Sequence, residues 1–479
     1  MTINALLDGI FRSLSYFSPE VALTAGFVLI ILAEIVLKDH SRKFQILWFL
    51  TFGLVFGVGI LVLKQWQNSP HFLFSHLLYL DNKAVFFKML ILAAGFLLLL
   101  SVGWRSTLPP ELLTILPAFL LGLFLMTMAT NLLSIYLSIE VVSVCSYIFT
   151  GLAPTRKASE GALKYLLFGA LSSGVMLYGI SLLYGMTGSL DITTETFTNT
   201  LAQNPSFPLF VAGLLTLAGL FFKLSLVPFH VWTPDVYQAV AAPIVAFFSV
   251  APKAAALLIV MRVAMALPQS FQILLASVAL VSILVGNLSA LWQDNAQRML
   301  AYSTIAQSGF MLVGVAALNE TGFRAATFYI GTYLFFNWTV FLLIEWLAPD
   351  GRLASFAGLG WQHKTAGLAL TVAVLALVGL PPTSGFMGKL LVFSGLWEAY
   401  QSSQNNVLLL LLVVGLLNAA VSLFYYLKIP FMLYFREPIT TQKPAQLTVY
   451  QQIIILALLL PTLLFFFKSD WLMAFIEIL

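Results

Sequence analysis

Residues 215–237 read LTLAGLFFKLSLVPFHVWTPDVY, and this stretch decides the fold because a charge and two prolines interrupt an apolar helix. Lys223 stands in its apolar first half with no polar residue beside it except Ser225. A charged side chain near the bilayer centre costs from about 3 to more than about 10 kcal/mol, so it persists only beside protein, water or a counter-charge. Pro228 and Pro234 each remove a backbone donor and predict a broken helix. Such breaks line wet cavities that bind the moving ion in transporters, so the stretch indicates an ion path.

The composition of the whole chain indicates an integral membrane protein. Of its 479 residues, 60% are hydrophobic and 9% are charged, and the mean hydropathy is +0.97, whereas a soluble domain carries about a quarter charged residues. The net charge of +4 is too small to indicate nucleic-acid binding. The single cysteine, Cys145, excludes an internal disulfide and a multi-cysteine metal site. No cleaved signal peptide is predicted, because the first apolar run continues past Glu34 without a cleavage site.

Apolar runs of about 20 residues predict an all-α fold of about fourteen transmembrane helices. The predicted spans are 20–38, 45–63, 84–103, 111–128, 131–152, 161–187, 207–235, 239–266, 271–292, 297–318, 324–348, 364–399, 406–436 and 449–468. Two of them, 207–235 and 364–399, would measure about 43 and 54 Å at about 1.5 Å per residue, which exceeds a hydrocarbon core of about 30 Å. Both are therefore predicted to be discontinuous, the second at Pro381 and Pro382.

The two long segments predict an internal repeat. The approach to each break is similar, TLAGL at 216–220 and ALVGL at 376–380. We therefore expect two inverted five-helix repeats, each with one discontinuous helix, and such matched breaks indicate a transport site. The predicted division of the chain is a three-helix segment 1–110, a first repeat 111–266, a connecting helix 267–296, a second repeat 297–436 and a C-terminal helix 437–479.

The loops on one side of the predicted spans hold most of the basic loop residues, among them Arg42, Arg156 and Arg352. The positive-inside rule assigns these loops to the cytoplasm. With an even number of spans, both termini are then predicted to lie on the outer side of the membrane.

Four charged residues inside spans are predicted to form a proton relay. Lys223, Lys253 and Lys389 are too deep to reach the headgroups, and Glu140 is the acidic residue that lies deepest in a span. A lysine in a low dielectric releases its proton more readily, and a nearby carboxylate opposes that release, so their separation can switch the lysine. The alternative is a set of buried ion pairs that fix helix packing. That alternative leaves cations unpaired, since three lysines face one glutamate, and such pairs stabilise little.

Two further residues are predicted to support the relay, each with an alternative interpretation. His230, shortly after Lys223, stands between the break and the row, or else its ring bonds to a carbonyl freed by Pro234. Lys164 lies within a turn or two of a span end, so its ammonium can instead extend to the headgroups. The same extension to the headgroups is expected of Lys88.

Three motifs carry a resemblance to a known family. FKLSLVPFHVWTPDVY at 222–237, APKAAALLIVMR at 251–262 and LPPTSGFMGK at 380–389 occur in that order, with Glu140 in an earlier span. Together they resemble the antiporter-like membrane subunits of respiratory complex I, the proton-pumping NADH:quinone oxidoreductase. The resemblance covers nearly the whole chain and is closest to the bacterial N-type subunit, which is called subunit 2 in mitochondria.

The resemblance implies a role for each charged residue. Glu140 and Lys223 would form the input pair, Lys253 the central connector and Lys389 the terminal site, while Lys164 would modulate the glutamate. It also implies a bacterial inner-membrane protein in a hetero-oligomer with other membrane subunits of complex I. NADH, flavin, iron–sulfur clusters and quinone would be bound by partner subunits and no cofactor by this chain. The sequence has neither a glycine-rich dinucleotide motif after a strand nor a cysteine set for such clusters.

Three alternatives remain open at this point. A subunit of a multi-subunit sodium/proton antiporter would share the lysine row. A free-standing solute transporter would need further polar groups at mid-depth, for which the candidates are Asn337, Asn418 and Ser422. A scaffold subunit would transport nothing, and the lysine row would then serve packing alone.

Overall fold

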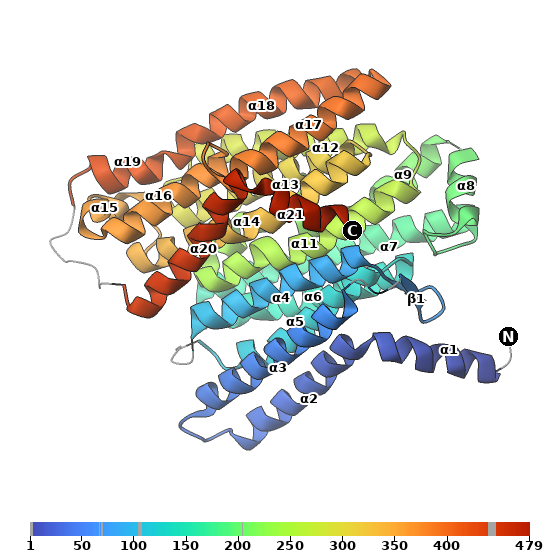
Figure 1. Ribbon diagram of the computed structural model, residues 1–479, viewed down its shortest axis with the longest axis horizontal. Helices are drawn as coiled ribbons and strands as arrows, with labels where there is room; N and C mark the ends of the chain where they lie inside the picture. The colour runs from blue at the N-terminus through green and yellow to red at the C-terminus, as the bar shows by residue number, and fades with distance from the viewer. Residues whose placement is uncertain (1–2, 67, 69, 104–107, 204, 439–446) are drawn as a thin grey trace. The chain divides into compact units, whose positions relative to one another are not determined.

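The structure is a computed structural model that describes residues 3–66, 68, 70–103, 108–203, 205–438 and 447–479 (Figure 1). It confirms the predicted helical membrane fold: thirteen helices among the described residues are long and apolar enough to cross a membrane. The predicted span 364–399 is the exception, because it is divided into two helices, and the apolar one, Lys364–Val378, is too short to cross alone. Among the described residues, the only paired strands are β1 (His71–Leu73) and β2 (Leu78–Leu80), which form an antiparallel hairpin.

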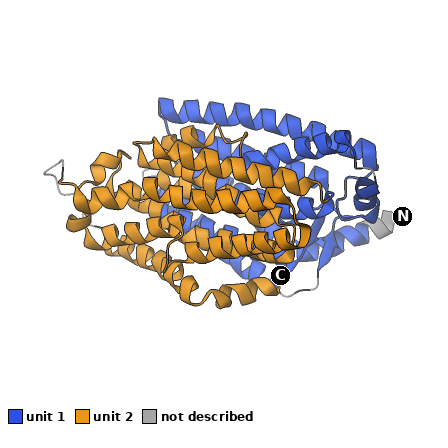
Figure 2. Ribbon diagram, turned by 90° about the horizontal axis from the view of Figure 1, so that it is seen from above, with its two compact units in different colours: residues 1–223, 251–268, 479 blue, residues 224–250, 269–478 orange. Residues whose placement is uncertain are grey.

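The chain forms two compact units, which Figure 2 distinguishes by colour. Unit 1 comprises residues 1–223, 251–268 and 479, and unit 2 comprises residues 224–250 and 269–478. Two helices, α9 and α11, are each shared between the units. The five-part division expected from the sequence stays a prediction.

Unit 1 is built from a bundle of long helices. Its helices are α1 (Ile3–Tyr16), α2 (Ser18–Val36), α3 (Lys43–Gln65), α4 (Asn82–Val102), α5 (Glu111–Met128), α6 (Leu132–Gly151), α7 (Arg156–Thr187), α8 (Glu195–Gln203), most of α9 (Phe207–Leu224) and the second half of α11 (Ala242–Ala266). Helix α5 packs against α2, α4 and α6, and α6 packs against α7. At Gly179 the backbone of α7 approaches Thr216 of α9 so closely that a Cβ atom would overlap it.

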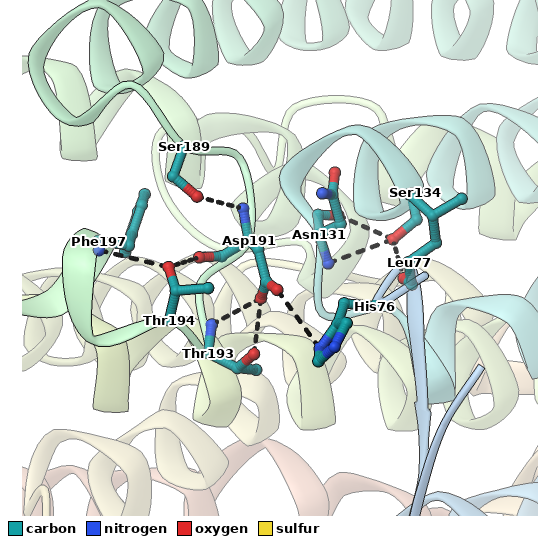
Figure 3. A network of polar contacts seen from close by, with 9 residues as sticks. All are labelled: His76, Leu77, Asn131, Ser134, Ser189, Asp191, Thr193, Thr194 and Phe197. Carbon is teal, nitrogen blue, oxygen red and sulfur yellow. Dashed lines mark hydrogen bonds and ion pairs between the residues drawn. The ribbon is translucent and has the colours of Figure 1, made fainter. Parts of the chain in front are cut away.

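A network of polar contacts fixes the start of α6, the helix that carries Glu140 (Figure 3). The Asn131 side chain accepts a hydrogen bond from Leu133 N at 2.9 Å, and Ser134 Oγ donates to the Leu77 carbonyl of the hairpin at 2.7 Å. Asp191, in the loop after α7, interacts with His76 Nδ1 at 3.8 Å. Because a capped first turn satisfies backbone donors that lack helical partners, these loops hold α6 at a defined register.

Unit 2 contains α10 (Thr233–Ala239) and the first part of α11. It also contains α12 (Phe271–Leu291), α13 (Ala296–Ala316), α14 (Glu320–Leu347), the 3₁₀ turn η1 (Leu353–Phe356), α15 (Leu359–Gln362), α16 (Lys364–Val378), α17 (Ser384–Ser403), α18 (Asn406–Tyr426), α19 (Lys428–Phe435), α20 (Val449–Phe467) and α21 (Ser469–Glu477). Helices α13 and α14 are almost wholly buried. They pack against each other and both contact α17, so the helix that carries Lys389 packs on the core of unit 2.

The first break separates α9 from α10. Helix α9 ends at Leu224, Ser225 adopts the left-handed conformation (φ 60°), and α10 begins at Thr233. Pro228 lies in the break itself, whereas Pro234 lies in the first turn of α10. A proline is tolerated in a first turn because its missing N–H has no helical partner there.

The second break separates α16 from α17 and is shorter. Helix α16 ends at Val378, Gly379 has φ +84°, and Pro381 and Pro382 precede the start of α17 at Ser384. The similar sequences before the breaks occupy different places, because Gly379 ends α16 whereas Gly219 lies inside α9, against Met176 of α7.

Candidate functional site

Lys223 is buried in the last turn of α9, directly before the first break. Its Nζ atom has no hydrogen-bond partner in the described part of the chain. Nζ lies over three aromatic rings, whose centroids are 5.6 Å (Tyr165), 5.9 Å (Phe222) and 6.0 Å (Tyr147) away. Such contacts attract a cation, by about 2 kcal/mol when desolvated, and a cation in a last turn also complements the helix dipole.

Glu140, the predicted counter-charge of Lys223, lies on α6. The two groups interact electrostatically, but they form no direct ion pair within the described residues. Glu140 Oε1 is itself buried and, among those residues, lacks a hydrogen-bond partner. The structure therefore brings the predicted input pair into one buried region with a polar atom of each side chain unsatisfied.

One glycine of unit 1 makes room for the aromatic side chains of this region. A Cβ atom at Gly169 of α7 would overlap the hydroxyl of Tyr147, which extends from α6. The same Cβ atom would also lie 3.2 Å from Phe222. The glycine thus determines where the Tyr147 ring can lie, and through it the surroundings of Lys223.

Lys253 lies in α11, in the half that belongs to unit 1. The lysine is 1% exposed and its helix neighbours Ala254 and Ala255 are fully buried. The structure thus places a third basic side chain in an apolar interior, next to Pro252 of the same helix.

The two supporting residues have different surroundings. Lys164 is 41% exposed and pairs with Glu160, one turn earlier on α7, at 2.8 Å, so both interpretations of this lysine stay predictions. His230 lies in the break of unit 2, and its Nδ1 atom is buried without a hydrogen-bond partner among the described residues. Its supporting role stays a prediction.

Lys389 in α17 is bound by the second break. Its Nζ donates hydrogen bonds to the carbonyls of Val378, at 2.7 Å, and Leu377, at 3.1 Å. These carbonyls belong to the last turn of α16, where backbone acceptors lack helical partners and the dipole favours a cation. Nζ also lies 4.5 Å from the ring centroid of Phe310. A helix end inside the protein is thus used as an ammonium site.

Gly379 is needed for this geometry. Its φ of +84° is one that side-chain-bearing residues rarely adopt, and a Cβ atom would lie 2.8 Å from Lys389 Cδ. The glycine therefore both turns the chain at the end of α16 and leaves space for the lysine stem.

A neutral polar network continues from the Lys389 site, and the sequence reasoning missed it. Gln307 Nε2 donates to the Leu377 carbonyl at 2.9 Å and to Tyr426 Oη at 3.0 Å. Tyr329 Oη donates to Gln307 Oε1, and Tyr426 Oη bonds to Ser303. All these side chains are buried. The sequence signal that could have indicated this network is the presence of a glutamine and several tyrosines within apolar runs.

A buried ion pair of unit 1 was also missed. Lys88 Nζ lies 2.6 Å from Glu20 Oε1, and both side chains are 0% exposed. The expectation that Lys88 extends to the headgroups is therefore wrong. Its ammonium turns into the bundle because a carboxylate from α2 lies there to meet it.

The polar candidates for a solute pocket hydrogen-bond to other groups of the protein. Asn337 Nδ2 donates to Ser249 Oγ at 2.5 Å, and Asn418 Nδ2 donates to the Val414 carbonyl one turn earlier at 3.0 Å. Ser422 Oγ donates to the Ala419 carbonyl at 2.6 Å. The first bond joins two helices and the other two lie within α18, so these groups give no support to a substrate pocket.

Comparison with known proteins identifies relatives over almost the whole chain. Residues 129–417 match the family described as NADH:quinone oxidoreductase/Mrp antiporter, transmembrane. The NADH-quinone oxidoreductase subunit N of Chlorobium chlorochromatii is 35% identical over 459 residues, covering 91% of this chain and 88% of the relative. A chain in the structure of respiratory complex I from Thermus thermophilus with bound aureothin is 30% identical, with a TM-score of 0.82, covering 95% of this chain and 98% of that one.

A more distant structural match concerns the fold alone. A chain of the Mrp complex from Dietzia sp. superimposes with a TM-score of 0.81 at 18% identity, covering 96% of both chains. The chain therefore shares its helical fold with a chain of the Mrp complex.

Proposed function

This chain belongs to the NADH:quinone oxidoreductase/Mrp antiporter family of membrane proteins, and on that premise we propose that it is the N-type, proton-translocating subunit of an NADH:quinone oxidoreductase. It is a multi-pass membrane subunit of a respiratory complex. The observation that carries the proposal is the buried pair Glu140 and Lys223, each with an unsatisfied polar atom among the described residues.

Hydration explains how that pair can work. A buried charge without a partner is highly unfavourable, so water is expected between the carboxylate and the ammonium. Lys223 lies in the last turn of α9, directly before the break, and no continuing helix restrains that turn. A small change at this turn alters the separation from Glu140, and the lysine then holds or releases a proton.

The later steps are assigned by residue environment. Lys253, in an apolar interior, is the central connector, since a charge placed there perturbs neighbouring groups strongly in a low dielectric. Lys389 is the terminal site, because the Val378 and Leu377 carbonyls at the end of α16 bind its ammonium. Lys164 and His230 are the supporting residues of the proposed relay.

The energy for transport is proposed to come from partner subunits. NADH, flavin, iron–sulfur clusters and quinone would be bound there, and signals from quinone reduction would reach this chain as charge or conformational changes. The host membrane is proposed to be the bacterial inner membrane, with both termini on the outer side.

The proposal is tested by replacing Lys223 with alanine in the whole complex. We expect assembly, retained NADH oxidation and a loss of most proton uptake into proteoliposomes, measured with a pH-sensitive dye. Lys157→Ala is the matched control, because Lys157 is an exposed lysine on α7. Undiminished pumping by an assembled Lys223→Ala complex would favour a scaffold role and contradict the proposal.

An antiporter complex is the second candidate, favoured only by the shared fold. Affinity purification of the chain from its own membranes separates the two candidates. Co-purification of flavin and NADH-oxidising activity supports the oxidoreductase, whereas sodium/proton exchange without such activity supports the antiporter.

A further inference from the structure

Three aromatic rings of unit 1 lie beside the ammonium of Lys223, and each comes from a different helix. Tyr147 lies on α6, Tyr165 on α7 and Phe222 on α9. Tyr165 is the central ring, because its centroid lies 4.9 Å from that of Tyr147 and 5.6 Å from that of Phe222. The three rings therefore form one packed group, the ring cluster, whose centroids lie 5.6, 5.9 and 6.0 Å from Nζ.

Lys223 differs from the two other described lysines whose ammonium lies over a ring. Lys88 Nζ also forms an ion pair with Glu20 at 2.6 Å, and Lys389 Nζ also donates to two carbonyls. Lys223 is 2% exposed, and within the described part of the chain its Nζ has no hydrogen-bond partner. The ring cluster is therefore the contact found there that attracts its charge.

A ring face suits a side chain that must hold a proton and then release it. The face attracts a cation through the quadrupole of the ring, but it has no oxygen or nitrogen lone pair that engages an N–H bond. A carboxylate or carbonyl oxygen, in contrast, accepts strong, directed hydrogen bonds from an ammonium. Beside the ring cluster, the N–H bonds of Lys223 therefore stay available to water.

Glu140 offers the ammonium a second place in the same region. It precedes Tyr147 by seven residues on α6, which is nearly two turns, so the two side chains leave the same face of the helix about 10 Å apart at about 1.5 Å per residue. Glu140 interacts electrostatically with Lys223, although each has a polar atom that lacks a partner among the described residues. The flexible four-carbon stem of a lysine allows its ammonium to move between the rings and the carboxylate.

We propose that the rings of Tyr147, Tyr165 and Phe222 are positioning residues, which hold the protonated Lys223 apart from Glu140 so that its proton can pass to water. This inference deepens the proposed function and rests on it. The ring cluster offsets part of the attraction of the carboxylate for the ammonium, and it thereby prevents the two groups from closing into a lasting ion pair.

The proton step balances without a redox change. Beside the rings, one N–H bond of the Lys223 ammonium breaks as an O–H bond forms on water, which leaves a neutral amine. The neutral amine has no charge for the ring faces to attract, so it is free to return toward Glu140. There it takes the next proton through water from the Glu140 carboxylic acid, whose O–H bond breaks. One proton enters and one leaves, and the ammonium is restored.

Fluorine atoms on the central ring test the inference, because they draw electrons from the ring face and weaken its attraction for a cation with little change of shape. In the whole complex, Tyr165 is replaced by phenylalanine that carries no, one, two or three ring fluorines. Tyr165→Phe should pump normally per NADH, since the ring face is kept. Pumping should then fall with each added fluorine, several-fold in total, and Tyr165→Leu should pump least.

A second measurement tests the separation from Glu140. The infrared band of the Glu140 carboxyl, identified by its absence in Glu140→Gln, should shift stepwise with the number of fluorines at position 165. A weaker ring cluster leaves the ammonium nearer to that carboxyl, whereas a ring that only fills space would leave the band unchanged.

The matched control places the same fluorinated rings at Phe149, a buried residue of α6 whose ring packs on that of Phe119 at 5.3 Å. Pumping there should not depend on the number of fluorines. An equal fall at both positions would overturn the inference, as would pumping at position 165 that stays constant along the series. A loss already complete in Tyr165→Phe, normal pumping by Tyr165→Leu or an unshifted Glu140 band would overturn it too.

Lys223→Ala distinguishes this inference from the proposed function. If that variant loses pumping while the fluorinated variants keep it, only the ring cluster fails as a cation site. If Lys223→Ala pumps normally, the proposed function itself fails.

Discussion

Replacing Gly379 with alanine should disable the Lys389 site without changing an ionisable group. The left-handed backbone at this position (φ +84°) costs a residue with a Cβ atom about 1–2 kcal/mol. The new methyl would lie 2.8 Å from Lys389 Cδ, so the lysine stem must shift. The ammonium then loses its bonds to the Val378 and Leu377 carbonyls. Each charged hydrogen bond contributes about 1.5–3 kcal/mol, so the loss of both weakens ammonium binding by about 3–6 kcal/mol. This corresponds to a fall of about 100-fold or more in the fraction of time that the ammonium spends at the helix end.

Gly188→Ala supplies the matched control for this substitution. Gly188 also has a left-handed backbone (φ +68°), but a Cβ atom added there would meet nothing within 4 Å. The assay is NADH-driven proton uptake into proteoliposomes, divided by NADH oxidised. Gly379→Ala should pump several-fold less per NADH than Gly188→Ala. Equal ratios in the two variants would refute the assignment of the helix end as the ammonium site.

Two further substitutions probe the surroundings of the row. Gly169→Ala should displace the Tyr147 hydroxyl and lower pumping, whereas Gly174→Ala on the same helix, with nothing within 4 Å, should not; equal pumping by both would contradict the packing role. Gln307→Leu removes the donor to the Leu377 carbonyl and should lower the thermal stability of the complex, because each buried polar group left unpaired costs about 1–3 kcal/mol. An unchanged melting temperature would argue against that network as a stabilising element.

The helices and the breaks were predictable because each depends on local sequence. An apolar run of about 20 residues predicts a membrane-spanning helix, whether its side chains face lipid or the protein interior. A proline beyond the first turn removes a helix hydrogen bond and so predicts a break. Pro234 shows the limit of this rule, since it lies in the first turn of α10 and does not interrupt the helix. The depth of Lys223 and Lys389 was likewise readable, because a lysine far from both span ends has no route to the headgroups.

Pairings between distant helices were not predictable from one sequence. Glu20 follows Pro19 at the very start of a span and was not counted among the buried acids, and only the packing of α2 brings it to Lys88. The Gln307 and Tyr426 contact likewise joins helices far apart in the chain. Such residues are neutral or lie near span ends, so neither charge nor depth distinguished them before the fold was known.

The coupling of Glu140 to Lys223 is the central claim, and infrared difference spectroscopy of the whole complex tests it most directly. A carboxyl band that appears on reduction by NADH and is absent in Glu140→Gln reports the carboxyl group of that residue. The account predicts that this band shifts in Lys223→Ala, because the two groups interact electrostatically. A Glu140 band that is identical with and without the lysine would contradict it.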